Sequence, residues 1–268
     1  MLKKNIGEPK SVISWINKQW KIILAEFFAT MLLIIFGCMA CIPIQGFTPH
    51  PPMYAPLTFG FTVMFNIQIF GHISGAYMNP CVTVIALMWG KISVITTIAI
   101  ILAEAAGAIC GYGILMSVAP TDIVANGICM TLPHPGINDI QAVGIEIILT
   151  AALSLITCAL WDPVNADKAD SVPIKFGLTI AGLSFAGGPI TGASMNPVRS
   201  LGPALWANNW DSHWVYWVGP FVGGILPALF YKYIWLQKNE NVLALSIEYT
   251  FFMRIKYILF IDSHNVKA

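Results

Sequence analysis

The sequence predicts an all-α membrane protein, built as a bundle of six transmembrane helices plus two re-entrant half helices in an inverted repeat. Hydrophobic residues make up 57% of the 268 residues and charged residues only 10%, with a mean hydropathy of +0.72. A soluble domain carries roughly a quarter of its residues charged. Because so few charges cannot cover a water-exposed surface, a lipid bilayer is the solvent that fits. Two further observations support this prediction: long apolar stretches that could span the membrane, and an internal repeat.

The apolar stretches set the number of spans. A spanning helix needs about 20 mostly apolar residues. Six stretches fit, at about 20–43, 54–71, 92–117, 141–161, 174–188 and 213–236. Two further apolar pieces, 79–89 and 196–206, are too short to span, and each begins with Asn-Pro. Proline suits the first turn of a helix, so both pieces predict half helices entered through a loop.

The internal repeat has a fixed period. A shift of 117 residues places GHISGAYMNPCVT (71–83) on GPITGASMNPVRS (188–200), with seven matches in thirteen positions. Glu26 has a looser counterpart in Glu146, three residues out of register. Each copy holds three spans and one half helix. Since three is odd, the second copy must sit upside down in the membrane relative to the first.

Lysine and arginine placement predicts the orientation and the domain limits. With the N-terminus inside, thirteen of the fourteen basic residues fall in cytoplasmic segments, and the loop at about 118–140 contains none. Cytoplasmic loops are enriched in such residues. We therefore expect a multi-pass protein, in the plasma membrane, with a cytoplasmic N-terminal segment (1–19) and a cytoplasmic C-terminal tail (237–268). The domain that contains the spans (20–236) lies between them, with repeat one at about 20–117 and repeat two at about 141–236. Within the tail, residues 245–261 predict an interfacial amphipathic helix.

Two opposed half helices predict a narrow polar path. Their N-termini would meet near the bilayer midplane with unpaired N–H groups and positive dipole ends. The approach loops, Gly75-Ala76-Tyr77 and Gly192-Ala193-Ser194, would expose carbonyl oxygens as a ladder of acceptors. The amides of Asn79 and Asn196 would hold the oxygen of a passing water, so its hydrogens point away and relay no proton. The dipole ends would also repel cations.

These motifs resemble the major intrinsic protein family, the aquaporins. The resemblance covers roughly residues 20–236 and rests on the paired Asn-Pro loops, AEFFAT around Glu26, GHISGAYMNP, and HWVYWVGP before the last span. It implies a right-handed bundle and a homotetramer with one pore per subunit. The family's usual triplet is Asn-Pro-Ala, twice, whereas this chain has Asn79-Pro80-Cys81 and Asn196-Pro197-Val198. The third position mainly packs, so we expect a functional pore.

The resemblance also implies a selectivity filter nearer the outside. Counting from the motifs, its four positions are Phe59, Ser184, Ala193 and Arg199. Strict water channels typically have a histidine where Ser184 stands, and classical glycerol channels have a glycine there and a second aromatic in place of Ala193. A hydroxymethyl group in place of an imidazole widens the ring. The combination is closest to the insect glycerol-permeable aquaporins.

We therefore expect a passive channel for water, glycerol and urea that excludes protons and ions. A strict water channel is the alternative, and four residues of water-channel type favour it: Ser200, Ala204, Tyr216 and Trp217. A secondary transporter is the rival from another class, because inverted repeats with broken helices also build transporters. A closed, adhesive junction protein of the same fold is a third alternative. An enzyme is excluded, because no nucleophile–base pair, metal cluster or phosphate loop is present.

Membrane-embedded carboxyls normally suggest function. The resemblance implies that Glu26 and Glu146 brace the two half-helix loops. For Glu104 a similar polar brace is expected from its position alone, and a proton relay is the alternative. His72 precedes the first loop, and we expect it to line or cap the cytoplasmic mouth, with a pH gate as a further hypothesis.

The remaining features predict no further chemistry. We expect six free thiols, because cysteines in apolar runs behave as small hydrophobes. They are Cys38, Cys41, Cys81, Cys110, Cys129 and Cys158. Cys81, beside Asn79, is a candidate mercurial target if it reaches the pore. We expect no metal and no cofactor. With a net charge of +1 and scattered basic residues, nucleic acid is not an expected partner, and the lipid bilayer is.

Overall fold

A computed structural model describes residues 12–43, 46 and 51–236, and these residues form helices and no strand. The elements are α1 (Val12–Met39), α2 (Tyr54–Phe70), α3 (Pro80–Met88), α4 (Val94–Val118), α5 (Asp139–Trp161), the 3-10 helix η1 (Pro163–Ser171), α6 (Val172–Thr191), α7 (Pro197–Ala207), α8 (Val215–Phe230) and the π-helical turn η2 (Tyr231–Trp235). The predicted fold class is confirmed. The two short pieces that begin with Asn-Pro are the short helices α3 and α7.

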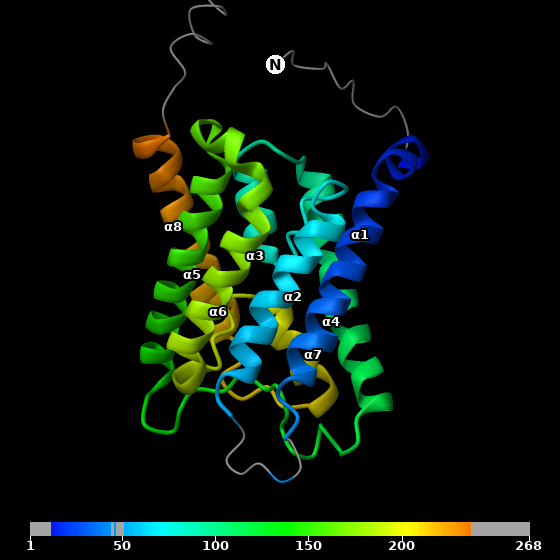
Figure 1. Ribbon diagram of the computed structural model, residues 1–268, viewed down its shortest axis with the longest axis vertical. Coiled ribbons are helices and arrows are strands. Elements are labelled where there is room, and N and C mark those ends of the chain that lie inside the picture. The colour runs from blue at the N-terminus through cyan, green and yellow to red at the C-terminus, as the bar shows by residue number, and fades with distance from the viewer. Residues whose placement is uncertain (1–11, 44–45, 47–50, 237–268) are drawn as a thin grey trace, which may run out of the picture. The chain divides into compact units, whose positions relative to one another are not determined.

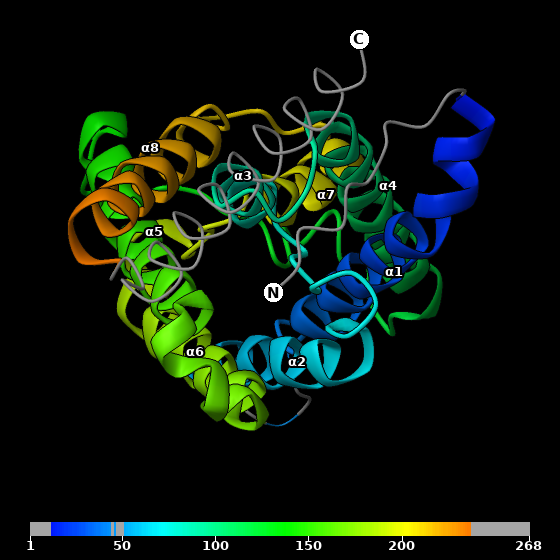
Figure 2. The same cartoon turned by 90° about the horizontal axis from the view of Figure 1, so that it is seen from above.

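The chain divides at Lys232 into two units, and the first contains the bundle. Within it, α1 packs on α4, α5 packs on α8, and α2 packs on α6 across the two repeats. The short helices α3 and α7 lie inside the ring of long helices and contact each other, with α4 and α8 flanking both (Figure 2). Each half helix thus packs on a long helix of the other repeat, α3 on α8 and α7 on α4, and the two half helices meet between the repeats (Figure 1).

Two glycines, 117 residues apart, allow α2 and α6 to touch. A Cβ atom added to Gly60 would lie 2.4 Å from the carbonyl oxygen of Gly177, and one added to Gly177 would lie 2.7 Å from the carbonyl oxygen of Gly60. Small residues let membrane helices approach until their backbones touch. Gly60 and Gly177 occupy equivalent positions under the repeat shift, so the contact joins the two copies at the same point of each.

The bundle is apolar outside and polar inside. Outward residues such as Leu102, Ile148 and Leu178 are more than 60% exposed, whereas Glu26 and Glu104 are completely buried. A soluble protein has the reverse pattern. Among the described residues, three helical stretches are long and apolar enough to cross a membrane, 19–39, 94–118 and 139–161. They match three of the predicted spans. The other three predicted spans correspond to α2, α6 and α8. Helices α2 and α8 have only 17 and 16 residues, and glycine, proline and Lys175 lower the hydropathy of α6.

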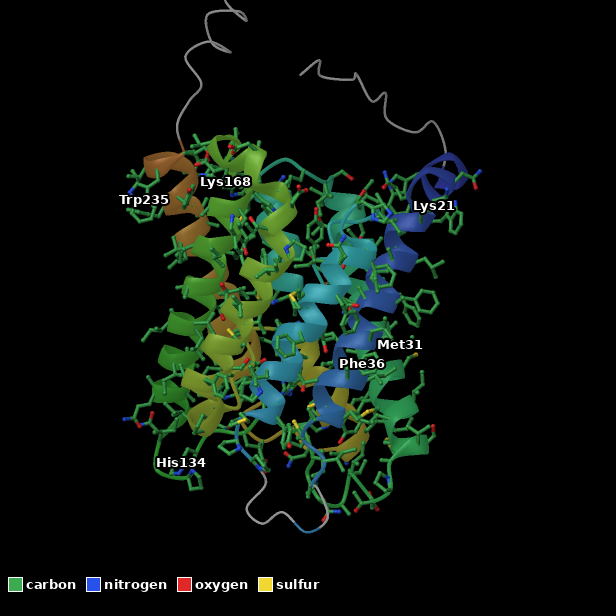
Figure 3. All side chains as sticks on the ribbon, viewed as in Figure 1. Lys21, Met31, Phe36, His134, Lys168 and Trp235 are labelled. Carbon is green, nitrogen blue, oxygen red and sulfur yellow. A yellow bond between two sulfur atoms is a disulfide. The ribbon has the colours of Figure 1, made fainter. Side chains whose placement is uncertain are left out.

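The two ends of the bundle differ in charge. Figure 3 shows Lys21 and Lys168 at one end and His134, in the loop between α4 and α5, at the other. This separation is the one that the positive-inside pattern predicts for a chain with its N-terminus inside. The predicted tail helix at 245–261 lies outside the described residues.

One expectation about the cysteines is wrong. Cys38, in the last turn of α1, forms a disulfide with Cys129, in the loop between α4 and α5. The other four cysteines are free thiols, as expected. The apolar run around Cys38 suggested a small hydrophobe, but the folded loop returns to the end of α1 and brings the two residues together. Disulfides persist in oxidising compartments, and the sequence predicts that this loop lies on the non-cytoplasmic side.

The glycine contact gives a stability prediction. We expect Gly177→Ala to lower the melting temperature in detergent, because the new methyl group would overlap the Gly60 carbonyl and overpacking costs about 1–3 kcal/mol. Gly182→Ala in the same helix is the matched control, because a Cβ there meets nothing within 4 Å. Equal melting temperatures for the two variants would contradict the proposed close contact.

Candidate pore

Two asparagines join the half helices. The Asn79 amide nitrogen donates to the Met195 carbonyl oxygen at 2.8 Å, and the Asn196 amide nitrogen donates to the Met78 carbonyl oxygen at 2.8 Å. Each asparagine also caps its own helix, since Asn79 Oδ1 accepts from Cys81 N and Asn196 Oδ1 accepts from Val198 N. Each side chain therefore fixes its own helix start and the opposite loop. An amide has two N–H donors, so each asparagine retains one beyond these bonds.

The two approach loops share one backbone conformation. Gly75, Ala76 and Met78 have positive φ angles, and so have Gly192, Ala193 and Met195. These positions are again 117 residues apart. Left-handed conformations are unfavourable for residues with a side chain, by about 1–3 kcal/mol each, and persist only where surrounding bonds hold them. The repeat seen in the sequence is therefore a repeat of an unusual backbone path.

Buried carboxylates hold that path. Glu26 accepts from the backbone N–H groups of Tyr77 and Met78, both at 2.9 Å. Glu146 accepts from the N–H groups of Ser194 at 3.0 Å and Met195 at 2.8 Å. Successive N–H groups in such a turn form a concavity for an anion. Both carboxylates thus lie where loop bracing was predicted.

Glu104 braces only the first repeat. It accepts from the Asn79 N–H at 2.9 Å and from the Thr83 hydroxyl at 2.6 Å. In the second repeat, the Asn196 N–H meets instead the Ser194 hydroxyl at 3.4 Å. That hydroxyl belongs to a chain in which Ser194 and Ser200 are 2.6 Å apart and Thr131 donates to Ser200 at 2.7 Å.

The four predicted filter residues lie on one cavity. Phe59, Ser184, Ala193 and Arg199 all line it, although they come from α2, α6, the second approach loop and α7. The Arg199 guanidinium donates to the Cys129 carbonyl oxygen at 2.7 Å and lies 4.9 Å from the centre of the Phe59 ring. A cation at that distance from an aromatic face is attracted to it.

The cavity has a volume of about 420 Å³ and runs past both asparagines. Both approach loops line it, including all six predicted ladder residues. Cys41, which follows α1, and Trp161, the last residue of α5, also line it. The predicted filter and the Asn-Pro meeting point therefore belong to the same path.

Five predicted pore or mouth positions lie away from the cavity wall, and two of them are Pro80 and Pro197, the first residues of α3 and α7. Cys81 and Val198, the third residues of the two motifs, are almost completely buried, and neither lines the cavity. His72 is exposed in the turn after α2 and does not line the cavity. Its role at a cytoplasmic mouth stays a prediction.

Trp161 and Cys41 are two of the cavity-lining residues that sequence reasoning missed. Trp161, the last residue of α5, packs edge-on against Tyr77, with ring centres 5.9 Å apart, and the Lys91 ammonium lies 4.8 Å from its ring. Cys41 follows α1 and is a free, half-buried thiol. Neither lies in a motif, and the only signal for Cys41 was its spacing from Cys38. In the described part of the chain, no three His, Cys, Asp or Glu side chains gather as a metal site.

The family model for the major intrinsic protein family matches residues 14–231. The chain belongs to this family. Its members are channels and not enzymes, so this protein is a multi-pass membrane channel.

Relatives and a solved structure support the same assignment. Aquaporin-4 of Mus musculus is 37% identical over 230 residues, covering 84% of this chain and 71% of that one. The lens fiber major intrinsic protein of Canis lupus familiaris is 36% identical over 225 residues, covering 83% and 84%. The X-ray structure of the aquaglyceroporin from Plasmodium falciparum matches with a TM-score of 0.67 at 22% identity, covering 80% of this chain and 96% of that one. The last comparison concerns the fold alone.

The cavity lining predicts the mercurial target. We expect mercuric chloride to reduce osmotic water permeability through Cys41, because its thiol lines the cavity while that of Cys81 is buried behind it. Swelling assays of Cys41→Ser and Cys81→Ser check this. The water permeability of Cys41→Ser should be insensitive to mercuric chloride. That of Cys81→Ser should be inhibited like that of the wild type and should recover when mercaptoethanol is added. The reverse pattern would place the accessible thiol at Cys81.

Proposed function

We propose that this protein is a passive channel for water and small uncharged solutes such as glycerol and urea, and that it excludes protons and ions. The observation that carries the proposal is the Asn79–Asn196 pair. Each amide is fixed by the opposite loop and lies on the same cavity as Arg199. A rigid pair of donors on a largely apolar path suits a neutral permeant with an acceptor oxygen.

Proton exclusion follows from the donors. One N–H of each amide is taken by a methionine carbonyl, which leaves one donor on each side for the permeant. A water whose oxygen accepts from both amides turns its hydrogens away from the pair, so the file of waters conducts no proton. The positive ends of α3 and α7 and the Arg199 guanidinium oppose cations.

We propose that the two approach loops form the rest of the path. Because the N–H groups of Tyr77, Met78, Ser194 and Met195 bond to buried carboxylates, the carbonyls of both loops remain for the permeant. They would replace the hydrogen bonds that a molecule leaves behind in bulk water. Glu26 and Glu146 are then supports of the path and not proton carriers.

The filter composition favours solutes larger than water. Phe59 offers an apolar face, Arg199 offers donors, and Ser184 and Ala193 leave the opposite wall small. A polyol fits such a site with its hydroxyls toward Arg199 and its C–H edge toward Phe59. This is the arrangement expected from the resemblance to the insect glycerol-permeable aquaporins.

The setting of the channel is part of the proposal. We propose a plasma-membrane homotetramer with both termini in the cytoplasm, in which residues 20–236 form the channel domain and 1–19 and 237–268 flank it. The basic residues Lys21, Lys91 and Lys168 support this orientation. Cytoplasmic segments are enriched in Lys and Arg, and all three residues fall in cytoplasmic segments when the N-terminus lies inside.

Swelling in three media tests the function. Oocytes expressing the protein are placed in hypotonic, isotonic glycerol and isotonic urea media. We expect fast swelling in all three, with a low activation energy and no saturation at modest gradients. Swelling in the hypotonic medium alone would indicate the strict water channel, and saturable uptake coupled to an ion gradient would indicate a secondary transporter.

Ser184 gives a direct test of the filter. We expect Ser184→His to leave water permeability largely intact and to abolish glycerol uptake, because the imidazole narrows the ring beside Phe59 and Arg199. Ser154→Ala is a control in the second repeat, since Ser154 is buried and donates to the Gly224 carbonyl away from the cavity. Persistent glycerol uptake in Ser184→His would show that Ser184 does not lie at the narrowest ring.

A further inference from the structure

The position of Arg199 depends on a loop residue. The carbonyl oxygen of Cys129 accepts the Arg199 guanidinium hydrogen bond at 2.7 Å, and Arg199 is only 7% exposed. Hydrogen bonds to a charged donor are shorter and stronger than neutral ones. Because the acceptor belongs to the backbone, its direction is set by the conformation of the loop and by no side-chain rotamer.

That conformation is unfavourable in isolation. Cys129 has a φ angle of 68°, in the left-handed region that residues with a Cβ atom seldom occupy. A residue persists there only where the surrounding structure holds it. The disulfide to Cys38 does so covalently, with the two Cα atoms 5.2 Å apart and Cys38 completely buried in α1.

The flanking residues are held by weaker bonds. The Tyr112 hydroxyl donates to the Ile128 carbonyl oxygen at 2.9 Å, and the Thr131 hydroxyl donates to Ser200 at 2.7 Å. These bonds fix the loop on either side of Cys129. The Cys129 carbonyl shares a peptide plane with the Met130 N–H, which donates to the Gly127 carbonyl oxygen at 3.3 Å, so this long hydrogen bond and the disulfide together set the rotation of that carbonyl.

The same turn of α1 also supports the aromatic side of the filter. A Cβ atom added to Gly37 would lie 2.3 Å from the Phe59 ring, so the absent side chain of Gly37 makes room for that ring. Gly37 therefore contacts Phe59, and its neighbour Cys38 ties down the acceptor of Arg199. Adjacent residues of one helix thus support two of the four filter positions.

We propose that Cys38 and Cys129 are positioning residues for the selectivity filter: their disulfide holds the Cys129 carbonyl toward Arg199 and so keeps the guanidinium against the pore. The inference rests on the proposed function. Without the disulfide, Cys129 relaxes toward the right-handed or extended region and its carbonyl turns away. Arg199 then loses a fixed acceptor, and the ring widens for solutes more than for water.

The first test is a set of variants in proteoliposomes. Urea and water permeabilities are measured together, because their ratio does not depend on the amount of folded channel. We expect Cys38→Ala, Cys129→Ala and the double variant to raise the ratio of urea to water permeability by the same factor, about ten-fold or more, as for loss of a hydrogen bond to a charged group. Cys110→Ala, at an exposed free cysteine of α4, should keep the wild-type ratio.

A second series separates positioning from simple cross-linking. In the Cys38→Ala background, residue 129 is changed to Gly, Ala or Val. Glycine adopts positive φ without a steric penalty, whereas a β-branched residue resists it. We expect the ratio of urea to water permeability to increase from Gly to Ala to Val, with the Gly variant nearest the wild type. A merely structural disulfide would lower the melting temperature in all three and leave one common ratio.

The variants need not all fold for the test to decide. Dithiothreitol transfers two electrons to the disulfide of the folded wild type, forms its own cyclic disulfide and leaves a proton on each cysteine sulfur. The reduced fraction is read by alkylation and mass spectrometry, and the ratio should rise with it. A ratio that stays at the wild-type value in reduced protein and in the double variant overturns the inference. A wild type without water permeability would instead overturn the proposed function.

Discussion

Two amide-to-carbonyl hydrogen bonds, from Asn79 to Met195 and from Asn196 to Met78, are the interaction on which the rest of the pore depends. Each bond fixes one half helix through the loop that leads to the other. Neither loop can therefore be placed correctly while its counterpart is out of position. Non-helical backbone inside a membrane is tolerated only where protein buries it or where it lines a cavity. The reciprocal pair meets both conditions, since it buries the loop tips against each other and leaves one amide N–H on each side for the cavity.

The two repeats reach this symmetrical pair by different means. In the first repeat two carboxylates, Glu26 and Glu104, brace the loop and the start of α3. In the second repeat Glu146 is the carboxylate that braces the loop. The Asn196 N–H donates to the Ser194 hydroxyl, which lies next to the Ser200 hydroxyl, and to no second carboxylate. Arg199 lies in the second half, and in the proposed function another carboxylate beside it would neutralise the charge that repels cations. Hydroxyls brace the backbone without adding charge.

Much of this arrangement could be predicted from the sequence, because it is local or repeated. The half-helix starts follow from Asn-Pro, and the bracing role of Glu26 and Glu146 follows the repeat and the resemblance. The disulfide, and the cavity positions of Cys41 and Trp161, could not be predicted in the same way. They depend on how the loop at 118–140 folds back and on how α5 is rotated about its axis, and neither leaves a periodic signal. The pairing had a weak signal, since Cys129 lies in a loop that the basic residues place outside.

Only a few of the polar groups inside the bundle are left to bind a permeant. The interior buries carboxylates, hydroxyls and loop N–H groups, and most of them bond to one another. Buried polar groups are costly unless they are paired, so a membrane bundle favours networks in which most of them bond to one another. The carboxylates take the N–H groups of both loops, which leaves loop carbonyls, one N–H from each asparagine and the Arg199 guanidinium for the cavity. Selectivity therefore depends on which groups the bracing network leaves unpaired. A substitution away from the cavity wall, in a bracing carboxylate or in the disulfide that holds the loop, would therefore affect the permeant by changing which groups remain unpaired.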